Sequence, residues 1–379
     1  MDFNPLKIAS NGCFSILNLA LDNPDFYNID LNRSDEYGYC LLHYAAEKGS
    51  VSTTRKLLIN KASVNVRNKD GQTPLLLACF HGQWAIVKLL LEKEVEINAN
   101  DHCGETPISL SIRSGDLQLI KLLIFKGADI NTKTKVNNSL LHLSVAAGNT
   151  VFVTFFINQG LDVNCLNNCN QTPLMLAVKS GLTEIVDILL RNKADYNIID
   201  HRNCNLMHLA VEANNLEICQ KLISCRINVN HSNNNGCTPL HYAAENNNSD
   251  IITLLVENNA KIDQQDIDNY TPLHAAATIK YNGKAIETLV TLKSNTNMFT
   301  FNGDSPLHRA AASGNQVAVK LLYKAELANM KNKDGYTPVM LAEHYERILI
   351  VTLLNELSET LKTTGIKKRV SFRGIPVRK

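Results

Sequence analysis

Six of the eleven histidines occupy the same position of a recurring tetrapeptide, and histidine is the residue type best suited to acid–base or metal chemistry near neutral pH. They are His43, His142, His208, His241, His274 and His308. Each lies in a different copy of the tetrapeptide. Stacked units rise by about 10 Å, so no two of these side chains share a metal with bonds of about 2 Å. The spacing predicts structural histidines and no metal site.

The cysteines and the remaining polar residues show no pattern of a catalytic or cofactor site. The closest cysteine pair, Cys165 and Cys169, lacks a second pair or histidines at zinc-finger spacing. The glycines do not form a phosphate-binding loop, and we find no Ser/His/Asp order. The start of the chain lacks a charged segment followed by an apolar run, so we expect no secretory signal and ten reduced thiols. We predict a protein without cofactor or enzymatic activity.

A short basic segment near the end of the chain is a second candidate for function. Lys368, Arg369, Val370 and Phe372 resemble the docking motif of regulatory subunits of type-1 serine/threonine protein phosphatase. In an extended strand, alternate side chains share one face, so Val370 and Phe372 would fill pockets while the basic pair meets an acidic surface. Ser371 follows two basic residues and resembles a site for a basic-directed kinase. A solubilising tail and a nuclear-import signal at 367–369 are the alternatives.

The composition excludes several classes of partner. The net charge is +2, with 38 basic and 36 acidic residues, so we expect no general binding to nucleic acid or anionic membranes. The most continuous apolar stretch, 348–354, is far shorter than the ~20 residues of a membrane span. Asparagine contributes 45 of the 379 residues. We interpret this excess as codon bias in an AT-rich genome.

The tetrapeptide recurs with a nearly constant period. Its clearest copies begin at Thr73, Thr106, Thr172, Thr238 and Thr271, and weaker copies begin at Cys40, Ser139, Asn205, Ser305 and Thr337. Seven successive gaps are 33 residues, one is 34 and one is 32. In most copies a glycine or an asparagine lies nine residues after the first residue of the tetrapeptide. An apolar run follows it, and a polar connection leads to the next copy. Each unit therefore predicts a helix, a tight turn, a second helix and an extended finger.

This unit resembles the ankyrin repeat. The resemblance covers ten repeats over 36–357, preceded by a degenerate capping repeat over 1–35, and it implies an all-α solenoid of helix-turn-helix units with short β-hairpin fingers. Residues 358–379 are expected to complete the last helix, with an end at Gly365, and to continue as a basic, disordered tail. In the resembled family, the tetrapeptide histidine bonds to the threonine hydroxyl and to the backbone of the next unit.

The resemblance also implies a binding role on the concave face formed by the fingers and the first helices. Aromatic residues at exposed slots there are the best candidates for partner contacts. They are Tyr37, Tyr39, Phe80, His81, Tyr270, Phe301 and Tyr336. We expect a monomeric, non-catalytic scaffold or adaptor in the cytoplasm or nucleus. The more specific hypothesis is that it targets type-1 protein phosphatase. The alternatives are a masking or inhibitory module that carries an import signal, and a secreted bacterial effector.

Overall fold

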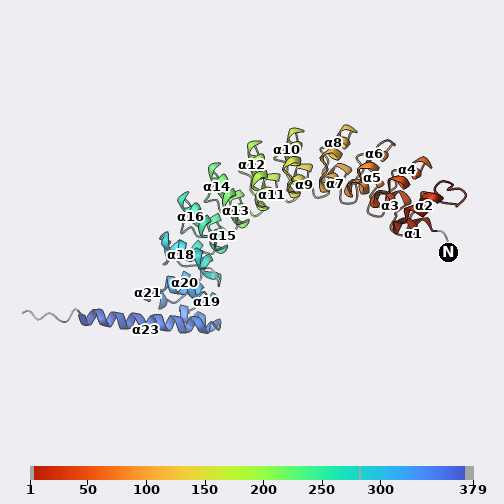
Figure 1. Ribbon diagram of the computed structural model, residues 1–379. Helices are drawn as coiled ribbons and strands as arrows, with labels where there is room; N and C mark the ends of the chain where they lie inside the picture. The colour runs from red at the N-terminus through yellow and green to blue at the C-terminus, as the bar shows by residue number, and fades with distance from the viewer. Residues whose placement is uncertain (1–3, 281–282, 372–379) are drawn as a thin grey trace, which may run out of the picture. The chain divides into compact units, whose positions relative to one another are not determined.

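The computed structural model describes residues 4–280 and 283–371, and these residues form helices joined by turns (Figure 1). The prediction of an all-α repeat fold is confirmed. The predicted β-hairpin fingers are not found: within the described ranges the only β-type pairing is an isolated bridge between Lys133 and Ser139. None of the helices in these ranges combines the length and apolar character needed to cross a membrane.

The chain divides into two compact units, and each is a stack of helix pairs. The first unit comprises the chain up to Ala177 and a second segment, Glu184–Ala194. Its first helices are α1 (Pro5–Ser10), α3 (Leu41–Lys48), α5 (Pro74–Phe80), α7 (Pro107–Ser114), α9 (Leu140–Ala146) and α11 (Pro173–Lys179). Its second helices are α2 (Phe14–Ala20), α4 (Val51–Ile59), α6 (Trp84–Leu90), α8 (Leu117–Phe125), α10 (Thr150–Asn158) and α12 (Thr183–Arg191).

The second unit comprises Val178–Thr183 and the chain from Asp195 onward. Its first helices are α13 (Leu206–Glu212), α15 (Pro239–Glu245), α17 (Pro272–Thr278), α19 (Pro306–Ser313) and α22 (Pro338–His344). Its second helices are α14 (Leu216–Ser224), α16 (Ser249–Glu257), α18 (Lys284–Thr291), α20 (Gln316–Leu322) and α23 (Ile348–Ser371). A four-residue helix, α21 (Ala325–Ala328), precedes α22.

Local capping explains where the helices begin. In the first helices the leading residue of the tetrapeptide is the N-cap, and Thr73 Oγ1 accepts a hydrogen bond from the Leu76 amide at 3.3 Å. Proline follows it at the first helical position, where no N–H is needed. Several second helices use an asparagine N-cap instead, with the side chain accepting from the amide three residues on. These caps are Asn149, Asn215, Asn248 and Asn315.

The turn between the paired helices requires a left-handed residue, and this explains the glycine slot. Gly49 has φ 78°, and Asn214 and Asn247 have φ 54° and 55° at the equivalent position. The prediction that asparagine substitutes for glycine here is therefore confirmed. Many asparagines of this chain thus cap helices or form turns, a role that the composition does not reveal.

The core consists of the faces that neighbouring repeats turn toward each other. In the first unit α3 packs on α5, and α5 packs on α7. In the second unit α15 packs on α17, and α17 packs on α19. The contributing side chains, such as Leu75, Ile86 and Leu90, are fully buried. Each repeat is therefore stabilised mainly by its immediate neighbours, as expected for a solenoid.

The last helix is longer than predicted. Helix α23 packs on α20 and α22 and runs for 24 residues to Ser371, through Gly365. The predicted end at Gly365 is therefore wrong, because a glycine inside a helix costs only about 1 kcal/mol and can be tolerated. Lys368, Arg369 and Val370 lie in this helix, whereas Phe372 lies outside the described residues.

Candidate protein-interaction surface

The fingers are the connections that lead from a second helix to the next first helix, and an Asp or Asn side chain shapes most of them. Its Oδ1 atom accepts hydrogen bonds from the amides two and four residues further on; for Asp35 these belong to Tyr37 and Tyr39, both at 2.9 Å. The same arrangement recurs in eight fingers, at Asp35, Asn68, Asp101, Asn167, Asp200, Asn233, Asp266 and Asn332. The fingers are tight turns for this reason.

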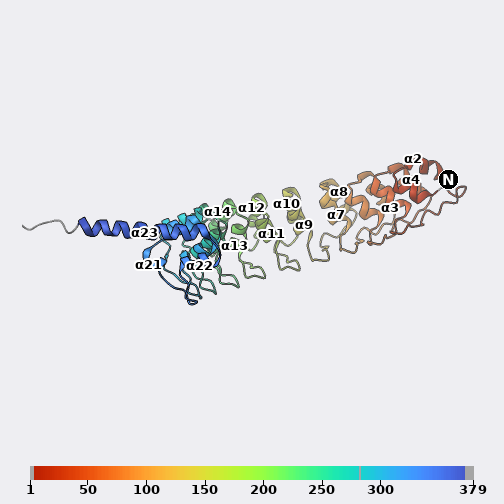
Figure 2. The same cartoon turned by 90° about the horizontal axis from the view of Figure 1, so that it is seen from below.

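Neighbouring fingers are joined by single backbone hydrogen bonds, and Figure 2 shows the loops along one side of each unit. In the first unit the Lys69 amide donates to the Tyr37 carbonyl at 3.0 Å, and three further bonds continue the series. In the second unit four such bonds join successive fingers, with N···O distances of 2.8–3.1 Å. In the first of them the Asn234 amide donates to the Arg202 carbonyl, and in the last the Lys333 amide donates to the Asn302 carbonyl. One bond per repeat is too few to form strands, but it fixes the spacing of the finger tips.

The six tetrapeptide histidines have the structural role that the family resemblance implies. In each, Nδ1 accepts from the backbone amide of the N-cap residue at 3.1–3.3 Å. Nε2 lies 2.9–3.2 Å from a finger carbonyl of the next repeat. Burial lowers the pKa of all six imidazoles, to about 4 for His208 and His274. Each ring is therefore a neutral link between adjacent repeats.

The predicted aromatic residues of the first unit differ in their exposure to solvent. Tyr37 is 63% exposed on its finger, whereas Tyr39 is half-buried, with its ring centroid 5.1 Å from that of Tyr44. Phe80 and His81, at the end of α5, meet edge-to-face at 5.0 Å. Tyr37 and Phe80 are thus available to a partner, and Tyr39 mainly supports the finger.

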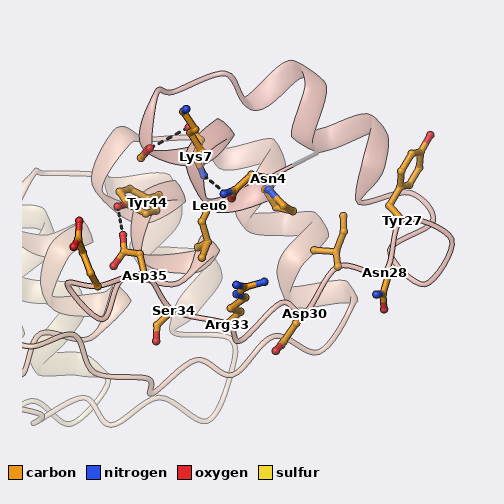
Figure 3. A pocket seen from close by; sticks show the side chains of 14 residues that line it. Asn4, Leu6, Lys7, Tyr27, Asn28, Asp30, Arg33, Ser34, Asp35 and Tyr44 are labelled. Carbon is orange, nitrogen blue, oxygen red and sulfur yellow. Dashed lines mark hydrogen bonds between the residues drawn. The ribbon is translucent and has the colours of Figure 1, made fainter. Parts of the chain in front are cut away.

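A polar hollow of about 640 Å³ adjoins the first finger and the start of the chain (Figure 3). Lys7 and Arg33 contribute positive charge to it, and Asp30, Asp35 and Glu36 contribute negative charge. The Tyr44 hydroxyl donates to Asp35, which holds the pKa of that carboxyl below its ordinary value even though burial acts in the opposite direction. This mixture of charges suits a polar peptide segment better than an apolar ligand.

Two of the three predicted residues of the second unit lie beside cations. The Arg309 guanidinium lies 5.4 Å from the centre of the Tyr270 ring, and Lys333 Nζ lies 4.3 Å from the centre of the Phe301 ring. Phe301 is 64% exposed, and the centroids of the Tyr336 and His344 rings lie 5.6 Å apart with the ring planes tilted by 47°. Aromatic rings and arginine on one exposed face are typical of residues that anchor a protein partner.

Arg309 is a candidate that the sequence reasoning missed. It also pairs with Asp304 at 3.5 Å, and Asp304 in turn accepts a hydrogen bond from Asn332 at 2.8 Å. The aligned repeats contain a signal for Arg309, because the residue directly after the tetrapeptide is Leu or Ala in seven of the ten repeats. The exceptions in this column are Tyr44, Tyr242 and Arg309. Residues at this position lie on the finger side of the first helices, so Tyr44, Tyr242 and Arg309 belong to the same surface as the fingers.

The described residues contain no cluster of three or more His, Cys, Asp or Glu side chains that could hold a metal ion. All ten cysteines lie in this part of the chain and none forms a disulfide. Burial raises the pKa of several thiols, to about 12 for Cys79 and Cys219, and such thiols are poor nucleophiles at neutral pH.

Comparison with known proteins identifies the class of this scaffold. A family model for ankyrin repeats, described as three copies, matches residues 5–101, 42–134, 108–200, 206–291 and 273–363. The chain belongs to the ankyrin-repeat family, and its repeats form a protein–protein interaction module.

Two plant proteins share a short stretch with this chain. The probable E3 ubiquitin-protein ligase XBOS33 of Oryza sativa subsp. japonica is 51% identical over 47 residues, and the E3 ubiquitin-protein ligase XBAT33 of Arabidopsis thaliana is 49% identical over 47 residues. Each match covers 12% of this chain and 9% of the plant protein. The similarity is thus restricted to a small part of both chains.

Removing the Arg309 guanidinium should weaken the second unit. Asp304 has only 8% side-chain exposure, so Arg309→Met leaves a buried carboxylate with less compensation, and we expect a loss of about 1–2 kcal/mol. The control is Lys48→Met: Lys48 is 42% exposed and pairs with the neighbouring Glu47 at 3.3 Å, so we expect a loss of less than about 0.5 kcal/mol there. Urea unfolding followed by circular dichroism compares the two. Equal losses would show that Arg309 has no special structural role.

Proposed function

We propose that this protein is a non-catalytic adaptor that recruits type-1 serine/threonine protein phosphatase through the segment 368–372, while the finger face holds a second protein. The observation that carries the proposal is the combination of a docking-type pentapeptide with an ankyrin scaffold in one chain. The finger face is supported as the second binding surface by Tyr37, Phe301 and the Tyr270–Arg309 pair. On this proposal the protein brings a substrate and an enzyme together.

Docking as an added strand requires the end of α23 to unwind. Lys368, Arg369 and Val370 lie in the last turns of this 24-residue helix. Gly365 precedes them and weakens the helix by about 1 kcal/mol relative to alanine. The expected break is therefore at Gly365, which leaves the packed part of α23 in place. Binding then includes the free energy needed to unwind about two turns.

The test is a binding titration of the full chain with purified phosphatase catalytic subunit. The variant Val370→Ala/Phe372→Ala removes both apolar anchors and should bind at least tenfold more weakly, since two buried side chains are lost. The matched control, Ile375→Ala/Val377→Ala, removes two apolar residues of the same tail outside the pentapeptide and should bind normally. Equal affinity of the first variant and the native chain would contradict the proposal.

The basic run 367–369 also supports a second function, a masking module directed to the nucleus. A reporter fused to residues 362–379 separates the two. Nuclear accumulation that depends on Lys367–Arg369, together with unchanged behaviour of the Val370→Ala/Phe372→Ala variant, would favour the import signal. We propose no ligase activity, because the similarity to the plant ligases covers 47 residues.

A further inference from the structure

The outer surface of helix α10 carries no charge, a feature that among the second helices of the described residues only the terminal helix α2 shares. No Asp, Glu, Lys or Arg occurs between 136 and 161, whereas every other second helix from α4 to α23 contains at least one. Second helices normally present a polar face to water. An uncharged face at this place therefore requires an explanation.

The side chains that α10 presents on this face are uncharged, and several of the larger ones are apolar and accessible. Val151 is 57% exposed, Phe155 is half-buried, and Phe125 of the neighbouring α8 is 84% exposed. A shallow hollow of about 390 Å³ lies across α8, α10 and α12. Leu117, Val151, Phe155 and Ile188 line it together with the uncharged polar residues Thr150, Thr154 and Asn158, with Glu184 at one side. The surface is thus an uncharged, partly apolar strip centred on α10 and flanked by one helix on each side.

The two flanking helices carry opposite charges at matching heights. The 33-residue period makes Lys121 of α8, Thr154 of α10 and Asp187 of α12 equivalent positions. Glu184 lies one turn before Asp187 and is exposed. Lys121 Nζ lies 6.0 Å from the centre of the Phe155 ring. At the height of Lys121 and Asp187 the strip is therefore positive on its α8 side and negative on its α12 side.

We infer that this strip is a homodimer interface, with a two-fold axis that lies in the interface parallel to α10. Rotation about this axis places α8 of one copy over α12 of the other and keeps the height along the helices. Lys121 of each copy then faces Glu184 and Asp187 of its partner. Phe155 and Val151 meet their own equivalents at the centre.

The same rotation gives a consistent set of contacts elsewhere in the strip. Phe125 and Arg191 are equivalent positions two repeats apart, so each exposed Phe125 ring faces the partner's Arg191, as in a cation–π pair. Leu122 faces Ile188 in the same way. An unrelated partner would have to reproduce this order of charges, whereas a second copy supplies it by symmetry. Three helices give an interface at the small end of the range for stable complexes, so we expect a dissociation constant of about 1–100 µM.

Sedimentation equilibrium of the full chain between about 1 and 200 µM tests this inference. We expect a monomer–dimer equilibrium that Val151→Asp shifts at least tenfold toward monomer, because it puts two like charges at the axis. Val151 is exposed enough for this variant to fold. The matched control is Val317→Asp, the second residue of α20 and 49% exposed, which should leave the equilibrium unchanged.

Charge exchange tests the symmetry itself. Lys121→Glu and Glu184→Lys should each weaken self-association about fivefold, since like charges face each other twice in each dimer. In an equimolar mixture, one charge contact of the mixed dimer is native and the other pairs the new carboxylate at 121 with the new ammonium at 184, so the mixture should associate more strongly than either variant alone. A monomer at 200 µM, growth beyond dimers, a dimer insensitive to Val151→Asp, or failure of the mixture to recover would each overturn the inference. Circular dichroism confirms that every variant is folded.

Discussion

Lowering the pH from 7 to 5 should destabilise the repeat stack by several kcal/mol, well before the carboxylates titrate. The cause is the set of six buried histidines that join one repeat to the next. In the neutral ring of His274, Nε2–H donates to the Asp304 carbonyl at 3.1 Å, and Nδ1 accepts from the Thr271 amide at 3.2 Å. Protonation of Nδ1 would point an N–H at an N–H and place a charge in a buried site.

The sign follows from the direction of the pKa shift. Burial lowers the pKa of His208 and His274 to about 4, compared with about 6.5 in the unfolded chain. Between these values the unfolded chain binds more protons, so stability falls as the pH falls from about 6.5 to about 4. At pH 5 each of these two histidines removes about 2 kcal/mol. The other four shift in the same direction and add to the loss.

Urea denaturation followed by circular dichroism at pH 7.5, 6.5, 5.5 and 4.5 measures this effect. We expect the midpoint to change little from pH 7.5 to 6.5 and to fall steeply below that. The variant His274→Gln cannot be protonated, so it should be less stable at pH 7.5 but lose less stability on acidification. Glu245 acts in the opposite direction, because burial raises its pKa, but it is one group against six. A midpoint that stays constant down to pH 5 would show that the histidines are not buried as neutral rings.

Phosphorylation of Ser371 should weaken binding of the proposed phosphatase about thirty- to hundredfold. The phosphate adds roughly −2 charges between the two apolar anchors, and the proposed docking surface is acidic because it must accept Lys368 and Arg369. Ser371 is also the last described residue of α23, and a negative charge at a helix C-terminus is unfavourable. Phosphorylation would therefore help the helix to unwind. We expect the repulsion at the acidic surface to exceed this gain, because it acts on the bound state directly.

Isothermal titration of the peptide 362–379, with and without phosphate on Ser371, measures this switch. A Ser371→Ala peptide is the control and should bind like the unmodified one, since the side chain points away from the anchors in an extended strand. Equal affinities of the phosphorylated and unmodified peptides would remove the switch but leave docking intact. Repeating the titration at 0.5 M salt should narrow the difference, because the repulsion is electrostatic.

The sequence by itself was sufficient for the helix pairs of the repeat, because they depend on local rules. Threonine or asparagine caps, proline at the first helical position, and glycine or asparagine in the left-handed turn act within a few residues. The period of 33 then placed each pair, and the family resemblance assigned the histidines to structural bonds between repeats.

The features that depend on contacts between repeats were decided only by the tertiary structure. The fingers lack strands because Asp or Asn side chains close each turn and only one backbone bond joins neighbouring fingers. Arg309 joins the finger face because Tyr270 and Asp304, from the adjacent repeat and finger, lie beside it. Helix α23 continues past Gly365 although a single glycine suggested an end. The contacts of Arg309 and the bonds between fingers come from groups distant in sequence, which a prediction along the chain does not place. Helix α23 continues because one glycine costs only about 1 kcal/mol.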